Sequence, residues 1–428
     1  MLSRMEHDSI GALNVPAEAY YGVQSMRAAT NFQITHRPLH PVLIDSIVMV
    51  KKAAAITNEK SGKLDQQIAQ AIIQACDEIL DGNLRDQFIV DAIQGGAGTS
   101  ANMNANEVIA NRAIEILGGT KGDYSIVHPN DHVNMSQSTN DVIPTAGKIT
   151  VLKLLPQTIK ELEKLEKAME EKEAEFDDIL KMGRTQLQDA VPMRLGQSFG
   201  AFAHVLKRDI KRLKNVMDEM KVLNIGATAI GTAINVDPYY LANISYELSK
   251  VAGISLKQAD DLIDATQNLD GFVSVSGVLK TCAVDISKIS NDLRLMSFGP
   301  RTGLSEINLP ARQNGSSIMP GKINPVIPEV VSQVAYLIIG HDYTITMAAE
   351  AGQCEEYIEK SVGISTALCP YIGYAKSAEI AKKSLKTGIS VKELVLEEGL
   401  LNEEELKEIL KPEKMTQLMR EKVMKAVS

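Results

Sequence analysis

The stretch Gly315-Ser316-Ser317-Ile318-Met319-Pro320-Gly321-Lys322-Ile323-Asn324-Pro325 lies between two strongly apolar segments with helical periodicity. Its two glycines allow backbone conformations that other residues avoid, so the segment can swing. Pro325 suits the first turn of the helix expected to follow. A helix N-terminus presents unpaired N–H groups and a partial positive charge, which favours anions. With Lys322, two hydroxyls and one amide, the stretch is predicted to be a mobile loop that can close over a carboxylate.

The composition is that of a helical globular protein with room for two or three domains in its 428 residues. Hydrophobic residues make up 44% and charged residues 23%, while aromatic residues are only 4% and Trp is absent, a balance that favours helix over sheet. The net charge of −9 argues against nucleic acid as a partner. An acidic protein that binds an anion must concentrate positive potential locally, so Lys322 is a candidate binding residue.

The four cysteines are widely scattered, without a CxxC pair or a Cys/His spacing typical of zinc. His128 and His132 are four residues apart, but Pro129 favours a loop there over a metal-binding helix. We therefore predict no metal and no cofactor. Since the chain also lacks an apolar signal core near its start and any membrane-length apolar run, a cytoplasmic protein is expected. The cysteines are Cys76, Cys282, Cys354 and Cys369, of which Cys282 lies on an apolar stripe and is predicted to be buried.

Three domains are predicted: a mostly helical N-terminal domain (1–141), a central bundle of long helices (142–353) and a small C-terminal helical domain (354–428). Apolar residues recur every seven positions from Leu155 to Phe176, and Pro156 is expected to kink or start that helix. The segment 326–345 is apolar nearly all round, so we expect it deep in a bundle or between subunits. We therefore expect a symmetric oligomer in which the copies share the bundle.

Polar clusters interrupt the apolar helices at three further places besides the 315–325 loop. Thr99 or Ser100 could cap a helix after the glycine-rich turn at 94–98, which lacks the lysine of a phosphate-binding loop. The six polar residues 136–141 exceed what one helix cap needs, so a lined anion pocket explains them better. The stretch 182–192 contains polar residues that are equally consistent with a turn between helices, and Arg184 and Asp189 with a structural ion pair.

The C-terminal segment carries cap signals but no concentrated chemistry. Ser390 with Glu393 fits a capping box, Asn402 with Glu405 resembles one, and Gly399 fits a helix end.

The 315–325 stretch resembles the signature loop of the aspartase/fumarase superfamily of elimination enzymes. Its continuation, Asn-Pro-Val-Ile-Pro-Glu-Val-Val at 324–331, is similar to the aspartate ammonia-lyase branch, whereas class II fumarases have a Thr-Gln-Cys-Glu-like run there. The resemblance extends over nearly the whole chain. It implies a mainly α, three-domain fold with a central long-helix bundle, and a homotetramer whose active sites combine polar regions from three subunits.

The resemblance also implies a reaction and roles for ten residues. The reaction is the reversible elimination of ammonia from L-aspartate to give fumarate, through an aci-carboxylate intermediate. Ser316 would be the general base, and Lys322, Asn324 and Thr185 would hold the α-carboxylate. Ser138, Thr139 and the Ser317 backbone would hold the β-carboxylate, and Thr99, Asn140 and Gln186 would surround the amino group. Since Gln186 replaces the His of many fumarases and cannot shuttle a proton near neutral pH, the general acid is not identified.

The chain departs from the family pattern after Gln353. In the family the preceding residues lead into a fifth bundle helix, but here Cys354 and a run typical of the C-terminal domain follow at once. The fifth helix is therefore predicted to be missing. Two alternatives to an aspartate ammonia-lyase remain open: a class II fumarate hydratase, and a truncated, catalytically inert structural relative.

Overall fold

The computed structural model describes residues 2–299, 301–351, 367–387 and 389–410. Within these ranges the protein is mainly α-helical, as predicted, with three two-stranded sheets of short strands. The chain divides into two compact units: unit 1 comprises Met1–Thr150, Lys221–Asn268 and Gln353–Ser428, and unit 2 comprises Val151–Met220 and Leu269–Gly352. The predicted three-domain division stays a prediction.

Unit 1 begins with an antiparallel hairpin of β1 (Ser3–His7) and β2 (Ala12–Pro16). Four helices follow: α1 (Val23–Asn31), α2 (Pro41–Lys60), α3 (Gln66–Leu80) and α4 (Thr99–Ile116). Helix α2 packs against α3, α3 against α4, and α4 against α1. The core between them contains fully buried β-branched side chains, including Ile47, Ile72 and Ile109. Burying each such side chain stabilises the fold by roughly 1.5–3 kcal/mol.

Unit 1 also contains α7 (Pro238–Ala252), which packs against α2, and several short elements. They are the 3₁₀ helix η1 (Arg85–Gln87), the π-helix η2 (Pro129–Val133), the parallel strands β5 (Val222–Leu223) and β6 (Lys257–Gln258), and α8 (Leu262–Gln267).

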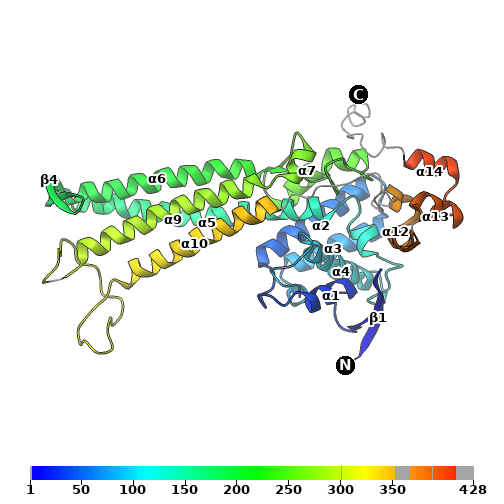
Figure 1. The fold of residues 1–428 in the computed structure, drawn as a ribbon, viewed down its shortest axis with the longest axis horizontal. Helices are drawn as coiled ribbons and strands as arrows, with labels where there is room; N and C mark the ends of the chain where they lie inside the picture. The colour runs from blue at the N-terminus through cyan, green and yellow to red at the C-terminus, as the bar shows by residue number, and fades with distance from the viewer. Residues whose placement is uncertain (1, 300, 352–366, 388, 411–428) are drawn as a thin grey trace. The chain divides into compact units, whose positions relative to one another are not determined.

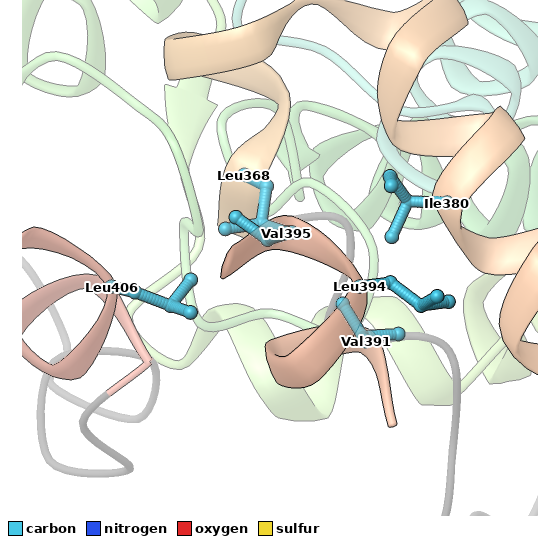
Figure 2. Close-up of a cluster of buried hydrophobic side chains, with 6 residues drawn as sticks. All are labelled: Leu368, Ile380, Val391, Leu394, Val395 and Leu406. Atoms are coloured by element: carbon cyan, nitrogen blue, oxygen red, sulfur yellow. The ribbon is translucent and has the colours of Figure 1, made fainter. Parts of the chain in front are cut away.

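The C-terminal segment of unit 1 has its own small apolar core. Figure 2 shows it, formed by Leu368, Ile380, Val391, Leu394, Val395 and Leu406. These residues lie on and around α11 (Cys369–Ile372), α12 (Tyr374–Thr387), α13 (Val391–Glu397) and α14 (Glu403–Ile409). Both predicted capping boxes are confirmed, at Ser390 with Glu393 and at Asn402 with Glu405. Gly399, with φ +64°, ends α13 as expected.

Unit 2 is built from long helices and one hairpin. They are the greater part of α5 (Thr139–Glu175), the strands β3 (Leu180–Thr185) and β4 (Gln188–Arg194), and the helices α6 (Leu195–Met220), α9 (Asp270–Ser297) and α10 (Val326–Ala351). The helices lie alongside one another (Figure 1), with Lys214 of α6 bonded to Glu163 of α5 at 2.7 Å, and α9 packed on both α6 and α10. Cys282 of α9 is buried, as predicted.

Helix α5 corrects one expectation. Pro156 does not start the helix, which begins at Thr139 and continues through it. A proline removes only one backbone hydrogen bond, and buried Leu152, Leu155 and Ile159 on both sides of it hold the helix by packing.

Helix α10 packs on α9, and polar contacts join the two helices, but much of its remaining surface is uncovered. Asp342 of α10 accepts hydrogen bonds from Lys280 Nζ at 2.6 Å and Ser276 Oγ at 2.8 Å, both on α9. Large apolar side chains on α10 remain exposed, with Leu337 58% and Tyr343 70% accessible. In a single copy this helix is therefore not deep in a bundle, which leaves a position between subunits as the expectation.

No helix in the described ranges has both the length and the apolarity needed to cross a membrane.

Candidate active site

Two helix N-termini line a cavity of about 1140 Å³ within unit 1. Thr99 begins α4, Thr139 begins α5, and both residues line the cavity together with Ser138 and Asn102. Because each helix start carries unpaired N–H groups and a partial positive charge, the cavity is suited to anions. Thr99, Ser138 and Thr139, predicted separately from the sequence, therefore border one cavity.

The start of α5 is held by a buried carboxylate. Asp141 accepts from Ser138 N at 2.8 Å with one oxygen, and from Gly226 N at 3.0 Å and Thr228 N at 3.1 Å with the other. Burial raises the pKa of Asp141 to about 6, although these three N–H donors act against the rise. Ser138 Oγ accepts from Asn140 N at 3.3 Å, so the Ser138 side chain caps the start of α5.

The other residues of the first cluster are also tied down. Asn140 Nδ2 donates to Ala229 O at 2.8 Å, and Thr139 Oγ1 accepts from Asn102 Nδ2 at 3.2 Å. The expectation that Thr99 or Ser100 caps α4 is wrong. Gly98 precedes the helix with φ +87°, no side chain caps this end, and Thr99 Oγ1 donates to Gly96 O at 2.7 Å. A left-handed glycine already turns the chain into the helix, so a side-chain cap has no place there.

Four non-glycine residues that line the cavity adopt positive φ angles. They are Ser136 at +62°, Thr228 at +58°, Ala233 at +54° and Asn235 at +63°. This conformation is unusual, above all for β-branched threonine. Such strain costs on the order of 1–3 kcal/mol per residue and clusters at functional sites. The stretch 225–232 forms part of the cavity wall, to which it contributes Thr228, Ala229 and Thr232.

The second predicted cluster lies in unit 2, at the tip of the hairpin of β3 and β4. Thr185 pairs with Gln188, and the two turn residues Gln186 and Leu187 have φ +53° and +62°. Positive φ at both positions is typical of a type I′ turn, whose twist matches antiparallel strands. The alternative of a turn between two helices is therefore wrong.

The base of this hairpin is fixed by an acidic residue outside it. Glu306 accepts from Arg184 and forms an ion pair with Lys181 Nζ at 3.0 Å. The side chain of Arg184 therefore pairs with Glu306 and not with Asp189, which faces Arg184 across the two strands. Hydrogen bonds from Arg184 lower the pKa of Glu306.

The third cluster, the 315–325 loop in unit 2, closes on itself. Gly315 N donates to Lys322 O at 3.0 Å, and Asn324 Nδ2 donates to Gly315 O at 2.8 Å. A Cβ at Gly315 would come within 2.5 Å of Asn324 N, so only glycine permits this closure. Lys322 and Ser317 are exposed, whereas Ser316 and Asn324 are half-buried.

Ser316 is placed to carry negative charge. Its Oγ accepts from the backbone N–H of Met319 at 2.9 Å and of Ile318 at 3.3 Å. Hydrogen bonds donated to an ionisable oxygen favour its deprotonated form. The loop therefore supplies part of what a serine needs to act as a base.

His132 lies on the π-helix η2 and His128 caps its start, so the prediction of a loop there is wrong. His128 Nδ1 accepts from the N–H groups of Asn130 and Asp131, and His132 Nδ1 accepts from His128 N at 2.9 Å. Burial lowers the pKa of both rings. Across the described part of the chain there is no group of three or more His, Cys, Asp or Glu side chains that could hold a metal ion.

Sequence reasoning did not assign a role to several polar residues in and behind the cavity wall. Lys51, Asn102 and Asn134 are joined by side-chain hydrogen bonds, and Lys51 and Asn102 are buried. The asparagines 102, 104 and 106 in α4 were the available signal, because asparagine is unfavourable inside a helix unless its amide has a partner.

The structure thus assigns the ten predicted residues to three groups. Thr99, Ser138, Thr139 and Asn140 belong to unit 1, the first three at one cavity and Asn140 bonded to its wall. Thr185 and Gln186 form the hairpin tip, and the remaining four belong to the loop of Gly315 to Asn324.

Comparisons with known proteins match this chain over most of its length. Residues 11–340 match a family model described as Lyase, and residues 364–417 match one described as fumarase C C-terminus. The aspartate ammonia-lyase of a Bacillus species is 50% identical over 96% of this chain and 97% of the relative. That of Escherichia coli K12 is 46% identical over 95% of this chain and 94% of the relative.

Solved structures agree in fold. A crystal structure of fumarate lyase:delta crystallin from Brucella melitensis bound to cobalt is 47% identical, with a TM-score of 0.81, and covers 97% of this chain and 100% of that one. A class II fumarase from Schistosoma mansoni is 32% identical, with a TM-score of 0.78, 97% coverage of this chain and 99% of that one.

The alignment with the Bacillus relative spans 455 positions, more than the 428 residues of this chain, so the relative contains residues in the matched region that this chain lacks. Identity near one half over almost the full length of the relatives, together with the match to the lyase family over most of the chain, leaves one conclusion. The chain belongs to the aspartase/fumarase superfamily.

Proposed function

We propose that the protein is an aspartate ammonia-lyase, a carbon–nitrogen lyase that converts L-aspartate reversibly to fumarate and ammonia. The observation that carries this proposal is the 50% identity to an aspartate ammonia-lyase over nearly the full length of both chains. The amide- and hydroxyl-lined cavity and the self-closing loop are consistent with a small dicarboxylate as the substrate.

In the proposed mechanism, Ser316 as its alkoxide removes a proton from the carbon next to the β-carboxylate and becomes a neutral hydroxyl. The electron pair passes into the carboxylate as an aci-carboxylate, then returns to form the double bond as the C–N bond breaks and ammonia leaves. Thr185, Lys322 and Asn324 hold the α-carboxylate. Thr99, Asn140 and Gln186 surround the amino group.

The difficult step is the accumulation of two negative charges on the β-carboxylate. Ser138, Thr139 and the Ser317 backbone are placed there in the proposal, and the start of α5 at Thr139 adds its partial positive charge. A fixed donor at a developing oxyanion contributes roughly 3 kcal/mol to transition-state stabilisation. Donors that bind the aci-carboxylate more strongly than the substrate accelerate the reaction.

The test is Ser316→Ala, followed by fumarate absorbance from L-aspartate and by calorimetric binding of L-aspartate. We expect turnover to be lost while binding persists, because the hydroxyl is removed and the carboxylate donors remain. Ser297→Ala is the matched control, since Ser297 Oγ donates to Arg294 O within α9. Near-normal turnover in Ser316→Ala would exclude this serine as the base.

A class II fumarate hydratase is the second candidate, and the likeness to the Schistosoma mansoni fumarase favours it. The same assay separates the two, because a hydratase forms fumarate from L-malate and not from L-aspartate. A chain that turns over neither substrate would be the inert structural relative.

Assembly and location are part of the proposal. We infer a cytoplasmic homotetramer whose active sites combine the three groups of residues from different copies, which would cover the exposed apolar face of α10. The extra aligned positions in the Bacillus relative support a missing fifth bundle helix. The junction of Gln353 and Cys354, where the sequence predicts this gap, lies outside the described residues.

A further inference from the structure

Lys51 is a lysine with no solvent exposure at all. It lies in the middle of α2, and its Nζ donates to Asn134 Oδ1 at 2.7 Å and to Gln137 Oε1 at 3.0 Å. Both acceptors are neutral amides. A buried ammonium without a directly bonded carboxylate is costly, so its presence calls for a reason.

The two acceptors of Lys51 line the cavity of unit 1. Asn134 Nδ2 also donates to Gln137 O at 3.2 Å, which closes the turn before α5. Asn102 Nδ2 donates both to Asn134 Oδ1 and to Thr139 Oγ1, each at 3.2 Å. One connected set of side chains therefore runs from Lys51 to the hydroxyl proposed to hold the β-carboxylate.

The same turn is supported from a second point on α2. Asn58 Nδ2 donates to Met135 O at 3.0 Å, and Ser136 Oγ donates to Asn58 Oδ1 at 2.9 Å. Ser136 has a positive φ, so the turn is held in a conformation that it would not adopt freely. Asn58 holds the turn in place but carries no charge, whereas Lys51 both holds the turn and carries a positive charge.

The charge of Lys51 also lies where an anion would benefit from it. Burial lowers the pKa of Lys51 to about 7, while nearby Asp141 and Cys76 act in the opposite direction. A dicarboxylate in the cavity would polarise the amides of Asn134 and Gln137 together with the ammonium behind them, because hydrogen-bonded chains strengthen one another in a medium of low dielectric constant.

We propose that Lys51 is a positioning residue for substrate binding: through Asn134 and Gln137 it fixes the turn before α5 and places a positive charge behind the carboxylate-binding end of the cavity. This inference rests on the proposed function. It concerns a residue that does not line the cavity and acts only through those that do.

The test compares Lys51→Met, which keeps the length and removes the charge, with Lys51→Arg, which keeps the charge. The matched control is Lys52→Met, because Lys52 is the next residue on α2 and pairs with Asp77 instead. The readouts are the KM and kcat for L-aspartate, the calorimetric Kd of succinate as an unreactive dicarboxylate, and Tm.

We expect Lys51→Met to raise the succinate Kd and the KM by about tenfold or more, the loss typical of a hydrogen bond to a charged group. Lys51→Arg should recover part of this loss, and Lys52→Met should bind as the wild type does. A Lys51→Met protein with a lower Tm but a succinate Kd within twofold of wild type would overturn the proposal, because Lys51 would then be merely structural.

Two further arms keep the result decisive. If Lys51→Met does not fold, Gln137→Leu removes one acceptor from an otherwise intact chain, and an unchanged succinate Kd in that variant would overturn the proposal. If wild-type protein binds succinate but does not release ammonia from L-aspartate, the proposed function fails, and the Kd comparison still tests Lys51.

Discussion

The charge of Lys322 stands out at the level of single residues because nothing in its own loop neutralises it. Its side chain is exposed, and the backbone hydrogen bond between Gly315 and Lys322 fixes where its stem begins. An exposed ammonium on a closing loop is suited to bind a carboxylate that arrives from solvent. We therefore propose that Lys322 contributes to substrate binding and Ser316 to proton transfer.

Replacing Lys322 by alanine should thus mainly weaken substrate binding. We expect Lys322→Ala to raise the KM for L-aspartate by roughly tenfold or more, as for the loss of a hydrogen bond to a charged group. Steady-state kinetics measure this directly, with Lys288→Ala as the control because Lys288 pairs with Asp292 along α9. An unchanged KM would contradict the assignment of this lysine to the α-carboxylate.

Asp91 is a carboxylate that holds the chain segments preceding Thr99 in place by hydrogen bonds. It accepts from Thr35 N at 2.9 Å and His36 N at 2.8 Å, while Gln94 bridges from Asp91 O to the N–H of Ala101 in α4. Burial raises the pKa of Asp91, but the donors at Ile93, Thr35 and His36 outweigh it and hold the pKa at about 2.

Because the folded pKa lies below the ordinary value of 3.8, the ionised form of Asp91 stabilises the fold above about pH 4, and this contribution is lost as the pH falls towards 2. Asp91→Asn should therefore lower Tm by several degrees at pH 7, and the difference from wild type should narrow by pH 3. Thermal melts at both pH values measure this. A difference that is equal at both would mean that the charge of Asp91 has no part in stability.

Among the elements, the hairpin of β3 and β4 contains the clearest local strain. Its turn places Gln186 and Leu187 at positive φ, where asparagine and glycine are preferred, and Leu187 is 71% exposed. No apolar packing explains a leucine there. The backbone conformation that presents Gln186 is therefore imposed by the strands, and it carries an energetic cost at the neighbouring residue.

Leu187→Gly should stabilise the protein relative to Leu187→Ala by about 1 kcal/mol, because alanine keeps the Cβ that disfavours this conformation and glycine does not. Urea unfolding midpoints of the two variants provide the comparison. Both should retain activity, since the turn geometry around Gln186 is kept. A glycine variant less stable than the alanine variant would show that the positive φ at position 187 carries no energetic cost.

The elements also show what the sequence could predict. The capping boxes at Ser390 and Asn402 were predicted correctly because each depends on residues three positions apart. The β-hairpin at 180–194 was not recognised, since its turn lacks the Asn-Gly signal. Its glutamine and leucine do not favour such a turn, and the strands impose the turn conformation on them. Pro156 does not start a helix, because packing along α5 outweighs its local cost.

In the proposed site, too, residues close together in the sequence could be predicted, whereas residues brought together by packing could not. Ser316 and Lys322 could be proposed as site residues because they lie in one contiguous motif. Lys51 and Asn134 could not, because they are 83 positions apart and meet only once α2 and the π-helix are packed. A buried lysine has no sequence signature of its own within an apolar helix such as α2.

At the scale of the whole molecule, the three groups of proposed site residues raise the question of how many copies make one site. Thr139 belongs to unit 1, while Ser316 and Gln186 belong to unit 2. The apolar face of α10, with Leu337 and Tyr343 exposed, is suited to contacts between copies. A site shared between copies makes a prediction that a site within one copy does not.

Two inactive variants should restore activity when they are mixed. In Ser316→Ala the group around Thr139 is intact, and in Thr139→Val the loop of Ser316 is intact. If each site takes these groups from different copies, random mixed assemblies contain sites with both intact, about one quarter of all sites at equal mixing. We therefore expect coexpressed Ser316→Ala and Thr139→Val chains to regain about one quarter of the wild-type fumarate production, measured against each variant alone. If both groups came from the same copy, the mixed preparation would stay as inactive as its parents, and the sharing of sites between copies would have to be abandoned.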